Sequence, residues 1–254
     1  MNIVVPIKLV PDLVEELSID PSGAALDTTW MRLIINEFDD HAVEQAILLK
    51  ESSGGLVTVI APDAEGIDDM LFTAAAKGAD RIIKLTGDFG QALNNHALGR
   101  ILATAIKELQ PDLVLTGVQA HNDLDGPVGP LLAEYLGIAY VGYVAGVKIN
   151  GGKAMVRKEY PGGLIAEMEV TLPAVLGIQA AEKPPRYVPI SKVRQSMKTS
   201  NIEEQPVVEL ESGGGPTVNR LFQPEAAERA TMIEGSTEEI ATRIVEILKE
   251  QGVL

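Results

Sequence analysis

The chain has 254 residues and a formal net charge of −15 at pH 7, and its composition is 46% hydrophobic but only 4% aromatic. Its length suits one α/β domain with an extended tail, and its charge argues against nucleic acid and anionic membranes as partners. The absence of cysteine excludes disulfides, thiolate catalysis and iron–sulfur sites, and the three histidines have no metal-ligand spacing.

The chain enters its first strand pattern at residue 3 without a basic or long apolar leader, and no run of 18 apolar residues follows. We therefore expect a cytoplasmic protein with no direct membrane insertion. Strand and helix patterns then alternate, which predicts a parallel sheet with right-handed crossovers. The expected strands are 3–9, 56–61, 81–85, 113–117 and 139–144, and the expected helices are 39–50, 67–77, 91–109 and 128–136.

From about Val144 the hydrophobic period changes to two. This change predicts antiparallel strands at 147–149, 153–160 and 164–172, followed by a buried strand at 174–178. Residues 1–182 are therefore expected to form a nucleotide-binding α/β domain, a Rossmann-like parallel sheet with an antiparallel hairpin extension. The composition of residues 183–254 predicts an extended arm that ends in an amphipathic helix at 237–251 and wraps a partner chain. The alternative is a tail that folds back on its own domain.

The loop 117–126, Gly-Val-Gln-Ala-His-Asn-Asp-Leu-Asp-Gly, carries the most informative functional pattern. It joins a buried strand to a helix, so its N–H groups and the helix N-terminus suit an anion such as a nucleotide phosphate. The alternative is an ordinary strand-to-helix turn. Pro6 and Lys8 end the first strand, where ligands of open α/β sheets gather, although an exposed lysine is also common there. Asn36 has the character of a helix N-cap.

Motifs along the whole chain resemble the beta subunit of electron transfer flavoproteins. Each motif is weak alone, but their order and spacing are specific. The segments that carry the resemblance are 5–8 (Val-Pro-Ile-Lys), 35–46, 76–80, 116–120, 161–164, 183–187 (Lys-Pro-Pro-Arg-Tyr) and 229–235.

The resemblance implies a heterodimer with an alpha subunit that carries most of the site for a redox-active FAD. The beta subunit shares that site and holds an adenine nucleotide of its own, which is AMP in most members and a second FAD in electron-bifurcating members. A partner dehydrogenase and a downstream electron acceptor or quinone oxidoreductase are also implied.

The resemblance also implies which residues of this chain bind the nucleotide. Pro127 lacks an N–H and Val128 lacks a hydroxyl, so two phosphate donors expected for AMP are missing. The sequence leaves a second FAD, AMP and an empty site open, with a slight preference for FAD. The implied residues are Pro6, Lys8, Asn36, Ala61, Asp63, Gly117, Gln119, Ala120, Asn122, Asp125, Gly126, Val128 and Gly129.

Two further regions follow from the resemblance. Leu13 stands where relatives carry an aromatic residue near the flavin of the alpha subunit. The resemblance therefore implies that Leu13 shields this flavin with an apolar side chain. Ile165 replaces a glutamate that helps position an alpha-subunit arginine over the flavin. Pro189, Ile190 and Ser191 correspond to a loop that docks on dehydrogenases, with Ile190 as the inserted side chain. The alternative for Ile190 is a strand residue packed on the alpha subunit.

The sequence therefore predicts an electron carrier subunit. No residue pair or motif indicates a general acid, a general base or a nucleophile, so the chemistry belongs to the flavin. The competing hypotheses are a non-redox adenine-nucleotide-binding module and a structural subunit with a decayed nucleotide site.

Overall fold

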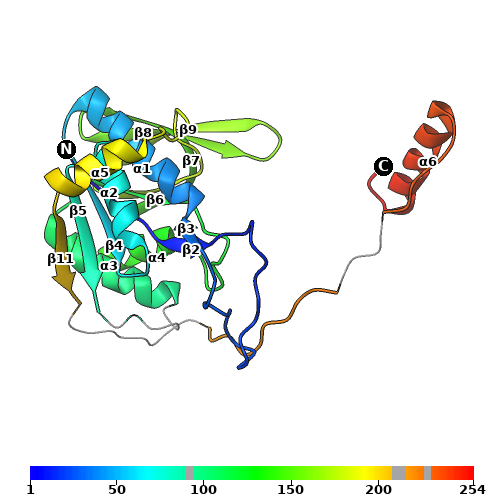
Figure 1. Ribbon diagram of the computed structural model, residues 1–254. Coiled ribbons are helices and arrows are strands. Elements are labelled where there is room, and N and C mark those ends of the chain that lie inside the picture. Colours follow the sequence, from blue (N-terminus) through cyan, green and yellow to red (C-terminus); the bar gives the residue numbers. More distant parts are fainter. Residues whose placement is uncertain (88, 90–93, 208–215, 226–229) are drawn as a thin grey trace. The chain divides into compact units, whose positions relative to one another are not determined.

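The computed structural model describes residues 1–87, 89, 94–207, 216–225 and 230–254 (Figure 1). It contains two compact units, Met1–Arg220 and Leu221–Leu254. Three residues of the expected helix 91–109 (91–93) and the first residue of the 229–235 motif lie outside the described part of the chain.

The first unit is a mixed α/β fold built on a largely parallel sheet. Its central strands are β1 (Asn2–Pro6), β4 (Leu56–Pro62), β5 (Arg81–Thr86), β6 (Leu113–Gly117) and β10 (Ala174–Ile178). An antiparallel extension consists of β7 (Ala139–Asn150), β8 (Lys153–Tyr160) and β9 (Leu164–Thr171), and β11 (Ile202–Pro206) forms the opposite edge. The strand order is β11-β5-β4-β1-β6-β10-β7-β8-β9.

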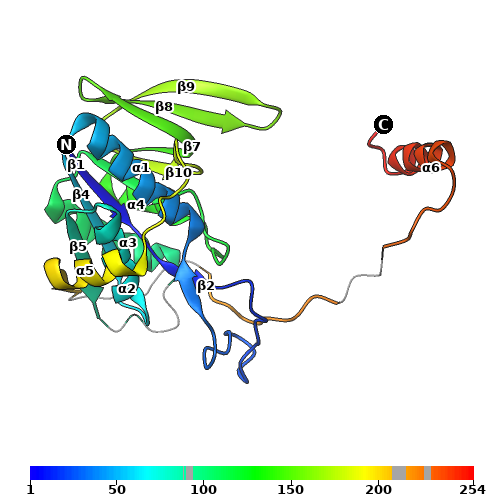
Figure 2. The ribbon, with the colours of Figure 1, turned by 45° about the horizontal axis from the view of Figure 1, so that its top comes forward.

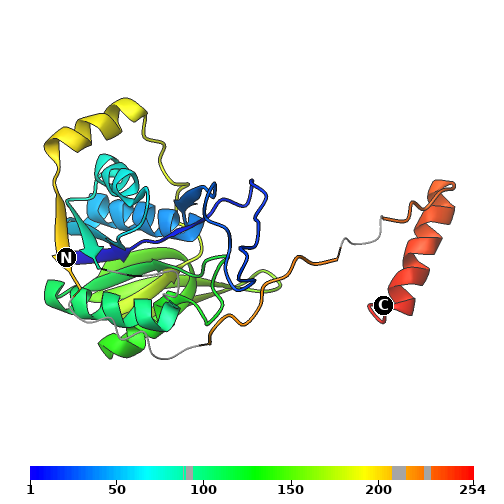
Figure 3. The same ribbon diagram turned by 60° about the horizontal axis from the view of Figure 1, so that its bottom comes forward.

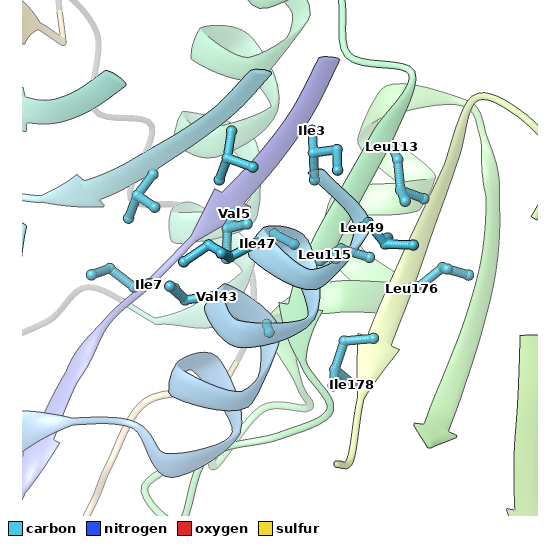
Figure 4. Packing of buried hydrophobic residues seen from close by; sticks show 14 of the residues in the cluster. Ile3, Val5, Ile7, Val43, Ile47, Leu49, Leu113, Leu115, Leu176 and Ile178 are labelled. Atoms are coloured by element: carbon cyan, nitrogen blue, oxygen red, sulfur yellow. The ribbon is translucent and has the colours of Figure 1, made fainter. Parts of the chain in front are cut away.

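Helices cover both faces of the parallel strands (Figure 3). One face carries α1 (Glu37–Ser53) and α2 (Ile67–Lys77), and the other carries α3 (Asn95–Leu109) and α4 (Val128–Leu136). Alternate residues of β1 face the two layers. Ile3 and Val5 pack with α1 (Figure 4), whereas Val4 belongs to the cluster that includes α3. The two aliphatic cores explain why a chain with so few aromatic residues can cover its sheet.

The first expected strand is interrupted. Residues 3–9 divide into β1 and β2 (Leu9–Pro11), and β2 turns away to pair with β3 (Leu33–Ile35) in a separate antiparallel hairpin. The break occurs because the N–H of Ile7 still reaches the carbonyl of Ile60 in β4, whereas the N–H of Lys8 is taken by a side chain of α1. Periodicity alone could not reveal this change of partner.

The strands expected at 139–144 and 147–149 form one continuous strand, β7. Its first half pairs parallel to β10 and its second half pairs antiparallel to β8, with an irregularity between Val144 and Gly146. The β8–β9 hairpin extends this end of the sheet (Figure 2). The structure therefore joins the parallel and antiparallel parts within a single strand.

The chain after residue 183 differs in its first part from the expected extended arm. Helix α5 (Ile190–Thr199) packs on α2, where the Ser196 hydroxyl donates to the carbonyl of Phe72 at 2.8 Å. Strand β11 then pairs in parallel with β5. Residues 190–206 therefore pack against the domain that contains α2 and β5.

The second unit contains α6 (Thr237–Glu250), close to the expected 237–251. Ser236 and Glu239 form a capping box at its start, which satisfies two of the unpaired N–H groups of the first turn. None of its side chains is buried, so its apolar residues are uncovered within this unit. Across the described residues, no helix has the length and apolar character needed to cross a membrane.

The turn after α1 generates a prediction about stability. Gly55 has a φ of +120°, and a Cβ there would overlap the carbonyl oxygen of Met1, whereas Gly54 has a φ of +71° and open space around it. We expect Gly55→Ala to lower the free energy of unfolding by about 2–3 kcal/mol, because it adds a backbone clash to the strain of a positive φ. The matched control Gly54→Ala should cost about 1 kcal/mol. Equal losses in urea denaturation would contradict the close approach of the N-terminus.

Candidate functional site

A small cavity lies at the carboxyl ends of β1 and β6. The order of the sheet reverses here, because β4 and β5 follow on one side of β1 and β6 lies on the other. Ligands of open α/β sheets bind at such a switch point. The cavity has a volume of about 20 Å³, which holds about one water molecule or one polar group of a larger ligand.

Part of the expected nucleotide-binding set lines this cavity. The residues come from the end of β1, the start of α1, the loop after β6 and the start of α4, which are distant in sequence. They are Pro6, Lys8, Asn36, Gly117, Gln119, Ala120 and Val128.

The other expected residues lie around the cavity without lining it. Ala61 is buried near the end of strand β4, and Asp63 is exposed just after this strand. Asn122 is exposed at the tip of the loop. Asp125 and Gly126 tie the loop to α3, where Asp125 accepts from the N–H of His96 and the carbonyl of Gly126 accepts from an asparagine amide.

The buried carboxylate of Asp39 joins three elements at the cavity. It accepts the N–H of Lys8 at 3.0 Å with one oxygen and the N–H of Gly117 at 3.0 Å with the other. Burial raises the pKa of Asp39 from its ordinary 3.8 to about 6, although these hydrogen bonds and the charge of Lys8 act in the opposite direction. A Cβ at Gly117 would overlap this carboxylate, so the contact requires glycine.

The side chain of Lys8 is already engaged by the protein. Its ammonium lies 2.6 Å from a carboxylate oxygen of Asp123, and the two side chains are only 15% and 9% exposed. The same oxygen accepts from the amide of Asn95 at 2.6 Å, and the second oxygen accepts the N–H of Ala120 at 2.7 Å. The charge of Lys8 is therefore compensated within the loop.

The hydroxyl of Thr116 is a buried polar group without a protein partner. Thr116 is 3% exposed and lines the cavity, and its Oγ1 makes no hydrogen bond. It lies beneath Gly129 in the first turn of α4, where a Cβ would come within 2.7 Å of this oxygen and 2.9 Å of the Tyr140 ring. Such a group is costly to bury unless water or a ligand satisfies it.

Asn36 precedes α1 as expected, but its side chain does not cap the helix. The amide donates to the carbonyl of Gln119 at 2.9 Å and so links the start of α1 to the loop after β6. The residue is 4% exposed. Asn36 is therefore the N-cap residue by position, but its side chain joins two distant segments instead of capping the helix.

The groups around the cavity suit a neutral polar part of a ligand better than an isolated phosphate. Lys8 is neutralised by Asp123, while Thr116 offers a hydroxyl that can donate or accept. These residues fit a base edge or sugar hydroxyl at the cavity, with any phosphate outside it. An adenine nucleotide as a whole is much larger than the enclosed volume.

Sequence reasoning missed several residues at the site. Asp39 and Asp123 resemble ordinary polar residues of a helix start and a loop, and only the folded chain brings them to Lys8 and Gly117. Leu98 and Leu102 of α3 are spaced by one helical turn, which signals a buried face but not which one. The missed residues that line the cavity are Ile7, Asp39, Leu98, Leu102, Thr116 and Asp123.

The residues expected at partner contacts lie on the surface. Leu13 is 61% exposed in the loop after β2. Pro189 is the N-cap of α5, and Ile190 and Ser191 are its first exposed residues, with Ile190 68% exposed. Among the described residues, no group of three histidine or acidic side chains could hold a metal ion.

Comparison with known proteins gives consistent matches. The family model for the electron transfer flavoprotein domain matches residues 28–210. The chain is 34% identical to an electron transfer flavoprotein subunit beta of Methylophilus methylotrophus, with 98% of each chain covered, and 33% identical to one of Clostridium acetobutylicum, with 99% of each covered. It is also 30% identical, over the full length of both, to an acryloyl-CoA reductase electron transfer subunit gamma of Anaerotignum propionicum.

Asp39 generates a prediction about pH. Its pKa in the folded chain lies above its ordinary value, so it contributes stability that is fully present below pH 3.8 and is lost as the pH rises through about 6. Asp39→Asn removes this dependence. We expect the free energy of unfolding of the variant, relative to wild type, to rise by on the order of 3 kcal/mol between pH 4 and pH 7 in urea denaturation.

The matched control is Glu37→Gln, an exposed acidic residue in the same helical turn. This change leaves Asp39 and its two main-chain contacts in place, so the variant should keep the pH dependence that we assign to Asp39. Parallel stability curves for Asp39→Asn and wild type would show that Asp39 titrates as an exposed carboxylate.

Proposed function

This chain belongs to the electron transfer flavoprotein family as a beta-subunit homologue, and from that premise we propose that it pairs with an alpha subunit to carry electrons from flavin-dependent dehydrogenases to a downstream acceptor. A bound flavin supplies the redox chemistry by accepting and releasing electrons. The residues of this chain bind, orient and shield that flavin. Leu13 contributes apolar cover to the FAD shared with the alpha subunit.

The observation that carries the nucleotide part of this proposal is the unpartnered hydroxyl of Thr116 in the cavity at the sheet switch point. An adenine nucleotide in the beta site places a polar group of its adenosine part against this hydroxyl. Asn36 and Asp39 hold the segments that border it, and the rest of the nucleotide lies outside the cavity. Phosphate contacts come from main-chain N–H groups of the loop and α4, because Lys8 is paired.

The dehydrogenase contact is assigned to the start of α5. Ile190 offers an exposed aliphatic anchor directly after Pro189, whose ring limits the freedom of the loop. The helix carries Lys192, Arg194 and Lys198 and no acidic residue, on a chain whose net charge is −15. This local positive charge supports docking of an acidic protein surface, because it offsets the repulsion from the rest of the chain.

The nucleotide content of the heterodimer tests the proposal. We expect the chain, co-expressed with its alpha subunit, to release one FAD and one further adenine nucleotide on denaturation, identified by chromatography and mass. A second FAD would indicate a site of the bifurcating type, and AMP would indicate a single-flavin carrier. A heterodimer without flavin would overturn the redox function.

Thr116→Val links the released nucleotide to the cavity. Valine matches the shape of threonine but removes the unpartnered hydroxyl, so the ligand-free chain should be as stable as wild type or more stable. We expect the variant to retain the FAD shared with the alpha subunit and to release several-fold less of the second nucleotide. Thr104→Val on the surface of α3 is the control, because the Thr104 hydroxyl donates only to the carbonyl of Arg100. Unchanged nucleotide content in Thr116→Val would place the nucleotide elsewhere.

Ile190→Ala tests the dehydrogenase contact. Loss of an inserted aliphatic side chain should raise the KM for a reduced flavin-dependent dehydrogenase by about 10-fold and leave kcat similar, because an interface anchor contributes 1–2 kcal/mol or more. The measurement uses the intact heterodimer and a dehydrogenase that reduces the wild-type complex. Met197→Ala, an exposed apolar residue further along the same helix, is the control. An unchanged KM for Ile190→Ala would remove this residue from the interface.

A further inference from the structure

The segment that leads to the proposed docking residues is fastened to α1 by consecutive contacts. The N–H of Ala181 donates to His41 at 3.2 Å, and the N–H of Glu182 donates to the side chain of Gln45 at 3.0 Å. These acceptors lie one helical turn apart on α1. An extended segment without sheet partners is thereby held along a helix.

Arg186 closes this attachment with its backbone and its side chain together. Its N–H donates to Glu44 at 3.0 Å, and its guanidinium donates to the two oxygens of the same carboxylate at 2.9 and 3.0 Å. The other edge of the guanidinium reaches Glu51 at 2.6 and 3.2 Å. One planar group thus joins two acidic residues that lie about two turns apart on α1, a geometry that lysine cannot reproduce.

Burial makes this attachment specific. The Glu44 side chain is 3% exposed, whereas Glu51 is 54% exposed and has its pKa lowered, chiefly by its hydrogen bond from Arg186. A buried carboxylate must be paired, so any displacement of Arg186 leaves Glu44 without its cation. The segment therefore has one strongly preferred position on α1.

A second attachment fixes the other side of the docking residues. The Ser196 hydroxyl is buried against α2 and donates to the carbonyl of Phe72 at 2.8 Å. The chain from Tyr187 to Gln195 runs between Arg186 and Ser196. Within it, Tyr187 and Ile190 present large exposed side chains. The structure thus holds a short exposed stretch at both of its ends.

We propose that Arg186 is a positioning residue that fixes Pro189, Ile190 and Ser191 for contact with the partner dehydrogenase through its attachment to Glu44 and Glu51. The inference rests on the proposed docking function of these three residues. Arg186 itself does not contact the partner. Its attachment orders the docking stretch before binding, so less conformational entropy is lost when the complex forms.

The test replaces Arg186 with lysine in the intact heterodimer. Lysine keeps the charge beside Glu44 but loses the planar two-sided contact. We expect amide hydrogen exchange in residues 187–193 to become at least 10-fold faster. We also expect the KM for the reduced dehydrogenase to rise about 5-fold with kcat within 2-fold of wild type.

Arg81→Lys is the matched control. Arg81 makes a similar two-bond contact with Glu203, at 2.9 and 2.7 Å, but this pair joins β5 to β11 and does not contact the 181–191 segment. It should alter exchange near β11 without changing exchange in 187–193 or the KM. Glu51→Gln is a milder second variant, because it weakens the attachment at its exposed side and leaves Glu44 paired. If Arg186→Lys impairs folding, Glu51→Gln provides the same measurements of exchange and KM.

The outcomes separate the two proposals. Faster exchange with a raised KM in Arg186→Lys and Glu51→Gln supports positioning. Exchange in 187–193 equal to that of wild type overturns it, whatever the KM. If exchange becomes faster but neither Ile190→Ala nor Arg186→Lys changes the KM, docking at this segment is wrong, and the positioning of a contact residue fails with it. A raised KM for Ile190→Ala alone keeps the docking site and rejects the role of Arg186.

Discussion

The site depends on one buried carboxylate, that of Asp39. Its two oxygens accept main-chain N–H groups just beyond β1 and at the end of β6, the strands that flank the sheet switch point. A fixed acceptor at this place holds the two strand ends at a constant separation and leaves a small cavity between them. It also explains the interruption of the first strand, because Lys8 gives its N–H to Asp39 rather than to a neighbouring strand. Gly117 is required at the same contact, since no side chain fits beside the carboxylate.

Helix α1 contacts both the candidate site and the proposed docking stretch. Asn36, directly before its first turn, and Asp39 within that turn lie at the cavity, and its later turns hold the segment that ends at Arg186. The cavity and the proposed docking stretch are therefore positioned from one rigid element. A helix can position these regions because its side chains have fixed spacing and direction and can accept hydrogen bonds there. A loop would lose conformational entropy before it could hold such acceptors in place.

The local charge at two places on the chain differs from what its net charge of −15 suggests. The chain is strongly acidic, yet Lys8 is paired with Asp123 in the loop after β6, and the charged residues of α5 are all basic. The first arrangement compensates the charge of Lys8, so Lys8 attracts an isolated phosphate less strongly. The second creates a positive surface beside Ile190. Net charge thus describes long-range repulsion, while individual ion pairs decide what each surface can bind.

The amino-acid sequence predicts correctly the elements whose hydrophobic pattern is regular. The helices 67–77 and 128–136 and the strands 113–117, 153–160 and 174–178 occur at the expected bounds, because period and turn residues act over a few neighbouring positions. The family followed from short motifs in a fixed order. Tertiary structure alone decided the continuity of β7, the return of 190–206 to the sheet, and the contacts of Lys8 with Asp123 and of Arg186 with Glu44. These contacts join residues more than 100 positions apart, and no local pattern specifies which distant partner a charged side chain will meet.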